Sequence, residues 1–264
     1  MVIEDMGFRM LFDSHAHYDD NKFDQDRQDV IEKVRQSGIA FIVNAASNIP
    51  SSIDSIALSQ EYEFIYAAVG VHPQDVEGMN DNVISMLADF AREPKVVAIG
   101  EIGLDYHYDD VPKPLQKHWF ARQILLAREL KLPIIIHDRE SHEDILKIVK
   151  KENAKEVGGV FHCFSGSVEM AREVLDNNFY ISIGGVATFK NAKKIVDVIR
   201  AIPSDRILIE TDSPYLAPEP FRGTRNDSSY IRYTAMKVAE IREDSFENIA
   251  RITCENAKRL FNIE

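Results

Sequence analysis

The chain of 264 residues carries 31 lysine and arginine side chains against 43 aspartate and glutamate side chains, a formal net charge of −12 at pH 7. This acidic balance argues against a broad basic surface for duplex nucleic acid, but leaves room for a small cationic site that binds a phosphate substrate. Hydrophobic residues make up 45% of the chain and charged residues 28%, which is ordinary for a soluble globular protein of enzyme size.

Short apolar runs of β type recur along the whole chain. They are nearly continuous in Val, Ile, Phe, Ala and Leu, as expected of parallel strands that are covered on both faces. The eight predicted strands are Arg9–Asp13, Ile39–Ala45, Phe64–Val71, Val96–Gly100, Leu132–His137, Gly159–Phe164, Phe179–Gly184 and Arg206–Glu210.

Stretches with helical periodicity separate these runs. Residues 19–37 place apolar side chains on one stripe, and residues 114–131 do so on one broad face around Trp119. Residues typical of helix N-termini support further helices that begin near Ser141, Ser167 and Asp244.

Eight alternations of strand and helix favour a single (β/α)₈ TIM barrel over residues 1–264. No GxGxxG or GxxxxGK[ST] sequence follows any predicted strand, which removes the usual nucleotide-binding signatures of an open doubly wound sheet.

Nothing in the sequence indicates passage through a membrane. The N-terminus lacks a basic segment followed by a long apolar stretch, so we expect no signal peptide. The longest apolar runs are too short to cross a bilayer. The two cysteines, Cys163 and Cys254, lack metal-like spacing and fit a reduced compartment. We therefore expect a cytoplasmic protein without membrane association or an obligate protein partner.

Polar residues follow the apolar runs at the carboxyl ends of the predicted strands, which converge at one rim of a barrel. His15 and His17 are two residues apart, so they project from the same face and can chelate one divalent ion. Further nitrogen and oxygen donors come from four other strand ends. Ligands of this kind suit Zn²⁺, Mn²⁺ or Fe²⁺ and admit Mg²⁺. The predicted metal ligands are His15, His17, Glu101, His137, His162 and Asp212.

Other residues near these strand ends have different or alternative interpretations. His72 precedes Pro73 and either shapes the loop or contacts the substrate. Glu210 shares the face of Asp212 and is expected to orient a ligand rather than bind metal itself. Cys163 follows His162 directly and so faces the other side of the strand, which excludes it as a ligand. The remaining histidines are interpreted as ordinary surface or helix residues: His107, His118 and His142.

With these residues in view, the sequence resembles the TatD family of metal-dependent deoxyribonucleases, within the amidohydrolase-like metal hydrolases. The resemblance runs in family order from residue 13 to about residue 226. The matching segments read DSHAH, AAVGVHP, AIGEIGLDYH, QKHWFARQILLARELKLPIIIHDR, FHCFSG, ISIGG and ILIETDSPYLAP.

The resemblance implies a barrel with two divalent metal ions, commonly Mg²⁺ or Mn²⁺, that hydrolyses DNA phosphodiester bonds. His15 and His17 would hold one ion, and Asp212 would meet that ion and the attacking water. Glu101 would bridge to a second ion held by His137 and His162. Where the family commonly reads RGKRNEP, this chain reads RGTRNDS from Arg222 onward, and this difference bears on substrate preference.

We therefore expect a 3′–5′ exonuclease that uses a metal-activated water, with Asp212 and Glu101 as catalytic residues and DNA ends or single strands as substrate. The predicted phosphate contacts, all in loops at the same rim, are Arg139, Lys190, Arg222 and Arg225. Two alternatives stay open. The same site would also suit a deacylase acting on D-aminoacyl-tRNA, and a non-catalytic metal-binding scaffold would require a missing ligand, which the sequence does not show.

Overall fold

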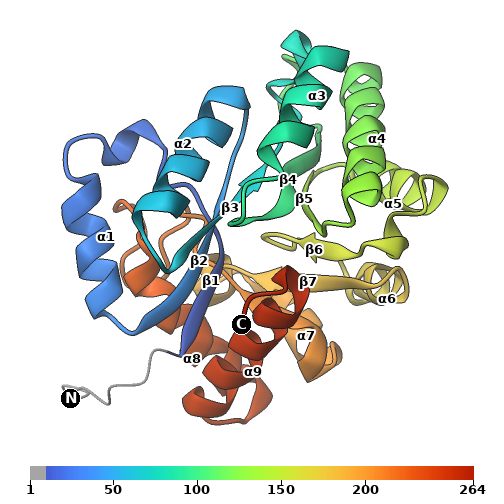
Figure 1. Cartoon of the computed structure of the whole chain (residues 1–264). Helices are drawn as coiled ribbons and strands as arrows, with labels where there is room; N and C mark the ends of the chain where they lie inside the picture. The colour runs from blue at the N-terminus through green and yellow to red at the C-terminus, as the bar shows by residue number, and fades with distance from the viewer. Residues whose placement is uncertain (1–9) are drawn as a thin grey trace.

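The computed structural model describes residues 10–264, in which eight parallel strands pair in chain order from the first to the last. The strands are arranged as a barrel with helices around it (Figure 1), so the predicted (β/α)₈ fold is confirmed. The strands are β1 Leu11–Ala16, β2 Ile39–Ala45, β3 Ile65–Val69, β4 Val96–Asp105, β5 Ile134–Arg139, β6 Gly159–Phe161, β7 Phe179–Ile183 and β8 Ile207–Ile209.

The observed strand ends differ from the predicted ones where polar residues remain in the sheet. β1 continues through His15 and β4 continues to Asp105, because these polar side chains are buried at the barrel mouth instead of leaving it in a loop. β6 and β8 are each only three residues long. Arg9, the first residue of the first predicted strand, lies outside the described residues.

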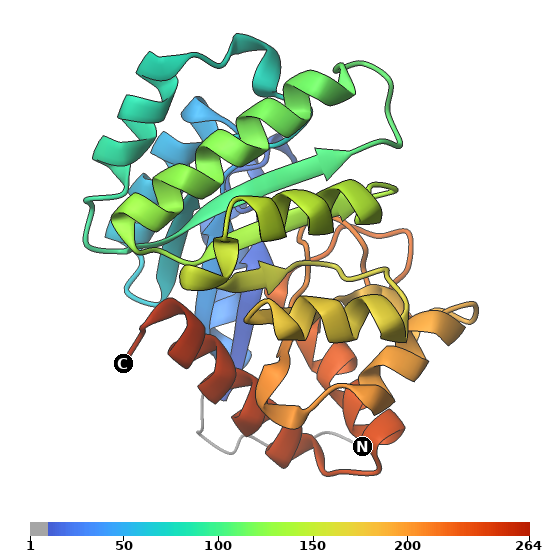
Figure 2. The ribbon, with the colours of Figure 1, turned by 90° about the vertical axis from the view of Figure 1, so that its right-hand side faces the viewer.

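Helices connect successive strands and cover the outside of the barrel (Figures 1 and 2). The helices are α1 Arg27–Gln36, α2 Ile49–Glu61, α3 Asp81–Phe90, α4 Lys113–Leu130, α5 His142–Lys151, α6 Val168–Asp176, α7 Lys193–Ala201, α8 Ile231–Arg242 and α9 Phe246–Phe261. Within residues 10–264, none of these helices has both the length and the apolar character needed to span a bilayer.

Two predicted helix starts need correction. The helix predicted over residues 19–37 is broken into a short 3₁₀ turn, Asn21–Phe23, and α1. Asp20 caps the start of the turn by accepting from the Lys22 backbone N–H, and the break follows because the Asp24 and Asp26 N–H groups bond to carbonyls three residues back instead of four. The last helix is capped by Ser245, which accepts from the Asn248 N–H, and not by Asp244. Ser167 caps α6 as predicted.

Alternating side chains of the strands divide the core into two layers. Outward-facing residues pack under the helices, and a smaller set fills the barrel interior. α9, the red helix of Figure 2, packs against β1 and β8, and its Phe261 ring stacks on Phe12 of the interior with ring centroids 6.0 Å apart. The side chains that fill the interior include Phe12, Val43, Ala68, Ala98, Ile135, Val160 and Leu208.

β1 and β8 meet at the carboxyl end of the barrel through individual contacts. Ala16 forms an isolated parallel bridge with Ser213. The N–H of Asp212 donates to the His15 carbonyl at 2.9 Å, and the N–H of His17 donates to the Ser213 carbonyl at 2.7 Å. The seam between the first and last strands therefore runs through the segments that carry predicted metal ligands.

Candidate metal centre

The structure brings all six predicted metal ligands together at the carboxyl end of the barrel. They come from the ends of β1, β4, β5, β6 and β8, and they form two clusters that share Glu101. Because the strands are parallel and adjacent, each strand end delivers its side chain to the same rim.

The first cluster surrounds the two histidines of β1. The Nε2 atoms of His15 and His17 lie 3.0 Å apart. Asp212 Oδ1 lies 3.6 Å from the first and 3.4 Å from the second. Glu101 Oε2 lies 3.4 Å and 3.7 Å from the same two atoms. Ligands held at about 2.0–2.2 Å from one ion stand about 3.0–3.6 Å apart, so this donor set fits one divalent cation.

The second cluster forms on the other oxygen of the same carboxylate. Glu101 Oε1 lies 2.7 Å from His137 Nδ1 and 2.8 Å from His162 Nε2, and these two nitrogens are 3.2 Å apart. Glu101 therefore turns one oxygen toward each histidine pair. The Oε1 contacts are hydrogen-bond distances, so these three groups would have to part slightly to hold a cation between them.

Hydrogen bonds on the far side of the rings leave the inward nitrogens free for metal. The His17 Nδ1–H donates to the Ala45 carbonyl at 2.7 Å, which leaves Nε2 with a lone pair. His137 Nε2–H donates to Asp105 Oδ2 at 3.1 Å, which leaves Nδ1 facing Glu101. His162 Nδ1 lies 3.5 Å from Glu210 Oε1, which accepts the Cys163 N–H at 2.6 Å, so the orienting role of that glutamate stays a prediction.

The electrostatics of the cluster favour positive charge between its carboxylates. Burial alone would raise the pKa of Glu101, but His162 and His15 outweigh it and hold that pKa well below its usual range. Burial would lower the pKa of His162, yet Glu101 raises it well above the ordinary value. The site thus stabilises positive charge where divalent cations would bind.

Asp13 is a site residue that the sequence interpretation missed. It is fully buried, and burial raises its pKa to about 7. Its Oδ1 accepts from the Thr211 N–H at 2.9 Å, and its Oδ2 accepts from the Thr211 hydroxyl and from Ser228 Oγ at 2.6 Å. Asp13 therefore ties β1 to the segment after β8, next to His15 and Asp212. Its position at the end of an apolar run, two residues before His15, was the available signal.

Asp105 is the second missed residue. It lies four residues after Glu101 at the end of β4, and its backbone is held by Gln116, which accepts from the Asp105 N–H at 2.9 Å and donates to the Asp105 carbonyl at 2.9 Å. A carboxylate fixed in this way holds the His137 ring in one orientation.

His72, one of the predicted substrate contacts, lies at the second cluster. Its Nε2 is 3.8 Å from Glu101 Oε1, and its Nδ1 accepts the Gln74 N–H at 3.2 Å, so the ring proton resides on Nε2. Burial lowers the pKa of His72 to about 3, which keeps the ring neutral.

The four predicted phosphate contacts differ in their surroundings. Arg139 lies over the Tyr108 ring at 5.1 Å, and Arg222 lies over the Phe189 ring at 4.4 Å. Lys190 is exposed. The guanidinium of Arg225 makes two hydrogen bonds to the Asp26 carboxylate, at 2.8 Å and 2.6 Å, so its charge is already matched by an acidic partner.

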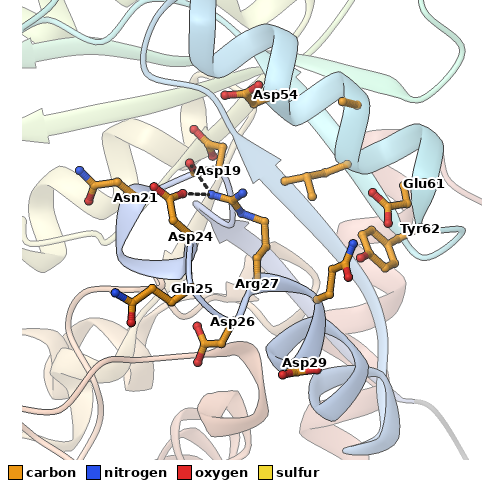
Figure 3. A pocket seen from close by; sticks show the side chains of 13 residues that line it. Asp19, Asn21, Asp24, Gln25, Asp26, Arg27, Asp29, Asp54, Glu61 and Tyr62 are labelled. Atoms are coloured by element: carbon orange, nitrogen blue, oxygen red, sulfur yellow. Dashed lines mark hydrogen bonds and ion pairs between the residues drawn. The ribbon is translucent and has the colours of Figure 1, made fainter.

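A separate hollow of about 660 Å³, lined mainly by acidic and other polar side chains, lies beside α1 and α2 (Figure 3). None of the six predicted metal ligands lines it. Arg27 lies at its centre and donates to the Tyr18 carbonyl at 2.6 Å and to Asp24 at 2.6 Å, so it holds its own loop together.

The barrel and the paired histidine–carboxylate clusters at its mouth define a metal-dependent hydrolase of (β/α)₈ fold. The chain belongs to the TatD family of these hydrolases: the family model described as TatD related DNase matches residues 12–262. The chain is 50% identical to the uncharacterized metal-dependent hydrolase YabD of Bacillus subtilis (strain 168), over 96% of this chain and 100% of the relative.

Two further relatives place the chain more finely within the family. It is 31% identical to the 3′-5′ ssDNA/RNA exonuclease TatD of Klebsiella pneumoniae (strain 342), over 96% of this chain and 98% of that protein. The crystal structure of YJJV, a TatD homolog from Escherichia coli K12, superposes with a TM-score of 0.91 at 31% identity and covers 97% of this chain and 99% of that one.

Proposed function

We propose that this protein is a 3′–5′ exonuclease that hydrolyses phosphodiester bonds at single-stranded ends of DNA. The observation that carries the proposal is Glu101, which turns one carboxylate oxygen toward each of two histidine pairs. Two adjacent cation positions suit an in-line displacement at phosphorus. The name of the Klebsiella relative, a ssDNA/RNA exonuclease, supports the same substrate class.

The proposed site holds two divalent ions, with Mg²⁺ or Mn²⁺ for activity and Zn²⁺ as a further fit to the ligand types. His15, His17 and Asp212 would hold one ion, His137 and His162 the other, and Glu101 would reach both. When bound, such ions lower the pKa of water and stabilise charge on the phosphate oxygens.

The chain's own groups would position and deprotonate the attacking water. The pKa of Asp212 lies below its ordinary value, because His17 and His15 outweigh the effect of burial, so the carboxylate is ionised and can accept a proton. Its backbone has φ +58 and is held by the N–H bonds to His15 and from Tyr215. Asp212 would act as the general base and Glu101 as the group that orients both halves of the site.

Phosphate contacts would come from the rim. His72 presents a neutral Nε2–H donor beside the second cluster. Arg139 is the last residue of β5, not a loop residue as predicted, and Lys190 and Arg222 lie in loops that follow β7 and β8. Arg225 is paired with Asp26, so it would contact a substrate phosphate only if this ion pair were broken first. With a net charge of −12, the chain can neutralise few phosphates at once, which favours strand ends over a long duplex footprint.

The deciding experiment is an activity panel on metal-stripped protein, reloaded with one ion at a time. Substrates are single-stranded DNA, double-stranded DNA, closed circular DNA, single-stranded RNA and D-aminoacyl-tRNA. We expect linear single-stranded DNA to be degraded from its 3′ end, with a loss of several orders of magnitude in Asp212→Asn and Glu101→Gln. Asp205→Asn, an exposed aspartate before β8, serves as the matched control and should retain activity.

Two outcomes would overturn the proposal. Faster release of the D-amino acid than of nucleotides would identify a deacylase instead. Equal rates on closed circular and linear DNA would contradict cleavage from ends. Cytoplasmic localisation and a single domain over residues 1–264 stay predictions.

A further inference from the structure

Several aromatic rings with a cation beside them lie in segments that follow strand carboxyl ends, and three such rings are those of Tyr108, Phe189 and Tyr215. One member of each pair follows a strand at its carboxyl end, and none is used to hold metal. The ring-to-cation distances are 5.1 Å for Tyr108 and Arg139, 4.4 Å for Phe189 and Arg222, and 3.8 Å for Tyr215 and Lys22.

Tyr215 lies beside the first cluster. Its ring centroid is 6.4 Å from that of His17, and the ring planes meet at 69°. The hydroxyl donates to Asp20 at 2.6 Å, and the backbone N–H donates to the Asp212 carbonyl at 2.8 Å. The ring is therefore held in one orientation, although its side chain is 42% exposed.

The exposed apolar side chains are unevenly placed. Six large ones are strongly exposed within residues 10–264, and three of them lie in loops after strand carboxyl ends: Tyr108, Tyr215 and Leu216. Tyr108 is 47% exposed and has the Arg139 guanidinium over its ring. An exposed ring that is held in place contributes little to the core of the fold, so the position of Tyr215 beside the first cluster points to a ligand.

Flat apolar faces next to cations match one ligand chemistry closely. The unstacked bases of a single strand offer π-faces, and the phosphates beside them offer negative charge. The bases of a duplex are already stacked on one another and present only their edges.

We propose that Tyr215 stacks the base next to the phosphate held at the metal centre, and that the Tyr108–Arg139 pair stacks a base further along the same strand. The exposed Lys22 side chain would leave the Tyr215 ring and pair with a phosphate. This inference rests on the proposed nuclease function and assigns its preference for single strands to particular side chains.

The test measures binding of a short single-stranded DNA with 2-aminopurine as its 3′-terminal base and phosphorothioate linkages that resist hydrolysis. The protein is loaded with Mg²⁺, and both affinity and fluorescence quenching are recorded. Tyr215→Leu should weaken binding by about 5- to 150-fold, the range that base stacking contributes, and should abolish quenching. Tyr215→Phe keeps the ring and should bind and quench as the wild type does.

A matched control exists at the other end of the barrel. Tyr66 lies near the start of β3, at the end of the strand that is away from the barrel mouth. Lys95 Nζ is 5.0 Å from its ring, so Tyr66 and Lys95 form the same kind of aromatic–cation pair. Tyr66→Leu should leave binding unchanged. An abasic 3′-terminal nucleotide should weaken binding to the wild type but have little effect on Tyr215→Leu.

Two results separate the inference from the function on which it rests. If the wild type degrades single-stranded DNA but Tyr215→Leu binds and quenches normally, or loses the same factor on normal and abasic probes, the stacking inference is wrong and the nuclease proposal stands. If the metal-loaded wild type hydrolyses neither DNA nor RNA, the nuclease proposal itself fails, and the inference fails with it.

Discussion

Replacement of Asp105 by asparagine should weaken metal binding at one of the two clusters only. Asp105 accepts two hydrogen bonds with its carboxylate, one from His137 Nε2 at 3.1 Å and one from the His107 N–H at 2.9 Å. An asparagine has nearly the same shape but only one accepting oxygen. Whichever way the amide turns, its NH₂ group faces an N–H donor, so either the His137 ring or the loop loses its anchor.

The size of the effect follows from the role of such a carboxylate. Loss of a group that orients a metal-bound histidine typically costs 10–100-fold in metal affinity, or about 1.4–2.7 kcal/mol. Titration of metal-free protein with Mn²⁺, followed by calorimetry and by electron paramagnetic resonance, would resolve two binding steps. In Asp105→Asn we expect one step to weaken by about 10–100-fold. The step that belongs to His15, His17 and Asp212 should be retained.

Asp138→Asn provides the control, because Asp138 is adjacent to His137 in sequence but contacts Ser141 and His142 instead of the cluster. It should leave both binding steps unchanged. An equal loss at both steps in Asp105→Asn, or no loss at either, would refute the argument that Asp105 acts through His137.

Three further experiments test the contact between Thr211 and Asp13, the protonation of His17, and the role of Arg225. Thr211→Val removes the hydroxyl that donates to buried Asp13, and it should lower the free energy of unfolding, measured in urea, by about 1–3 kcal/mol. Thr211→Ser keeps the hydroxyl and should have a stability near that of the wild type. Equal losses in the two variants would contradict this. Asp212 and Glu101 outweigh burial and raise the pKa of His17 to about 9. Metal-free protein should therefore lose about 3 kcal/mol of stability as the pH rises from 6.5 to 9, whereas metal-loaded protein, with His17 already deprotonated, should not; parallel curves would refute this. Arg225→Ala removes a half-exposed ion pair and should change stability by less than about 1 kcal/mol. It should raise KM for DNA if this arginine binds phosphate, and an unchanged KM would end that prediction.

The barrel, and the meeting of polar side chains at its rim, could be predicted because both depend on local patterns. Apolar runs with polar residues at their ends mark parallel strands, and parallel strands in a closed barrel bring those ends to one rim. His15 and Glu101 could therefore be assigned to one site without knowledge of their distance in space. The break between the 3₁₀ turn and α1 was missed because apolar periodicity continues through it, while the Asp24 and Asp26 N–H groups bond to carbonyls three residues back instead of four.

The orienting residues were harder to predict because their partners are distant in sequence. Asp13 is bound by Thr211 and Ser228, which are 198 and 215 positions away. No periodicity connects such positions, and a buried aspartate on an apolar strand has many structural explanations. The same holds for Arg225, whose pairing with Asp26 depends on how two loops meet.

The metal centre lies where the first strand meets the last, and this placement links ligand binding to closure of the barrel. His15 belongs to β1 and Asp212 follows β8, and the only parallel bridge between these ends in residues 10–264 is Ala16 with Ser213. The Asp13 carboxylate also joins β1 to the segment after β8, because it accepts hydrogen bonds from Thr211 and Ser228. A fragment that contains both halves of the first cluster must span residues 15–212, which is nearly the whole barrel, so the cluster forms only when the barrel has closed. A cation bound by His15, His17 and Asp212 would in turn stabilise the closed barrel over the open one, because it binds the folded state alone.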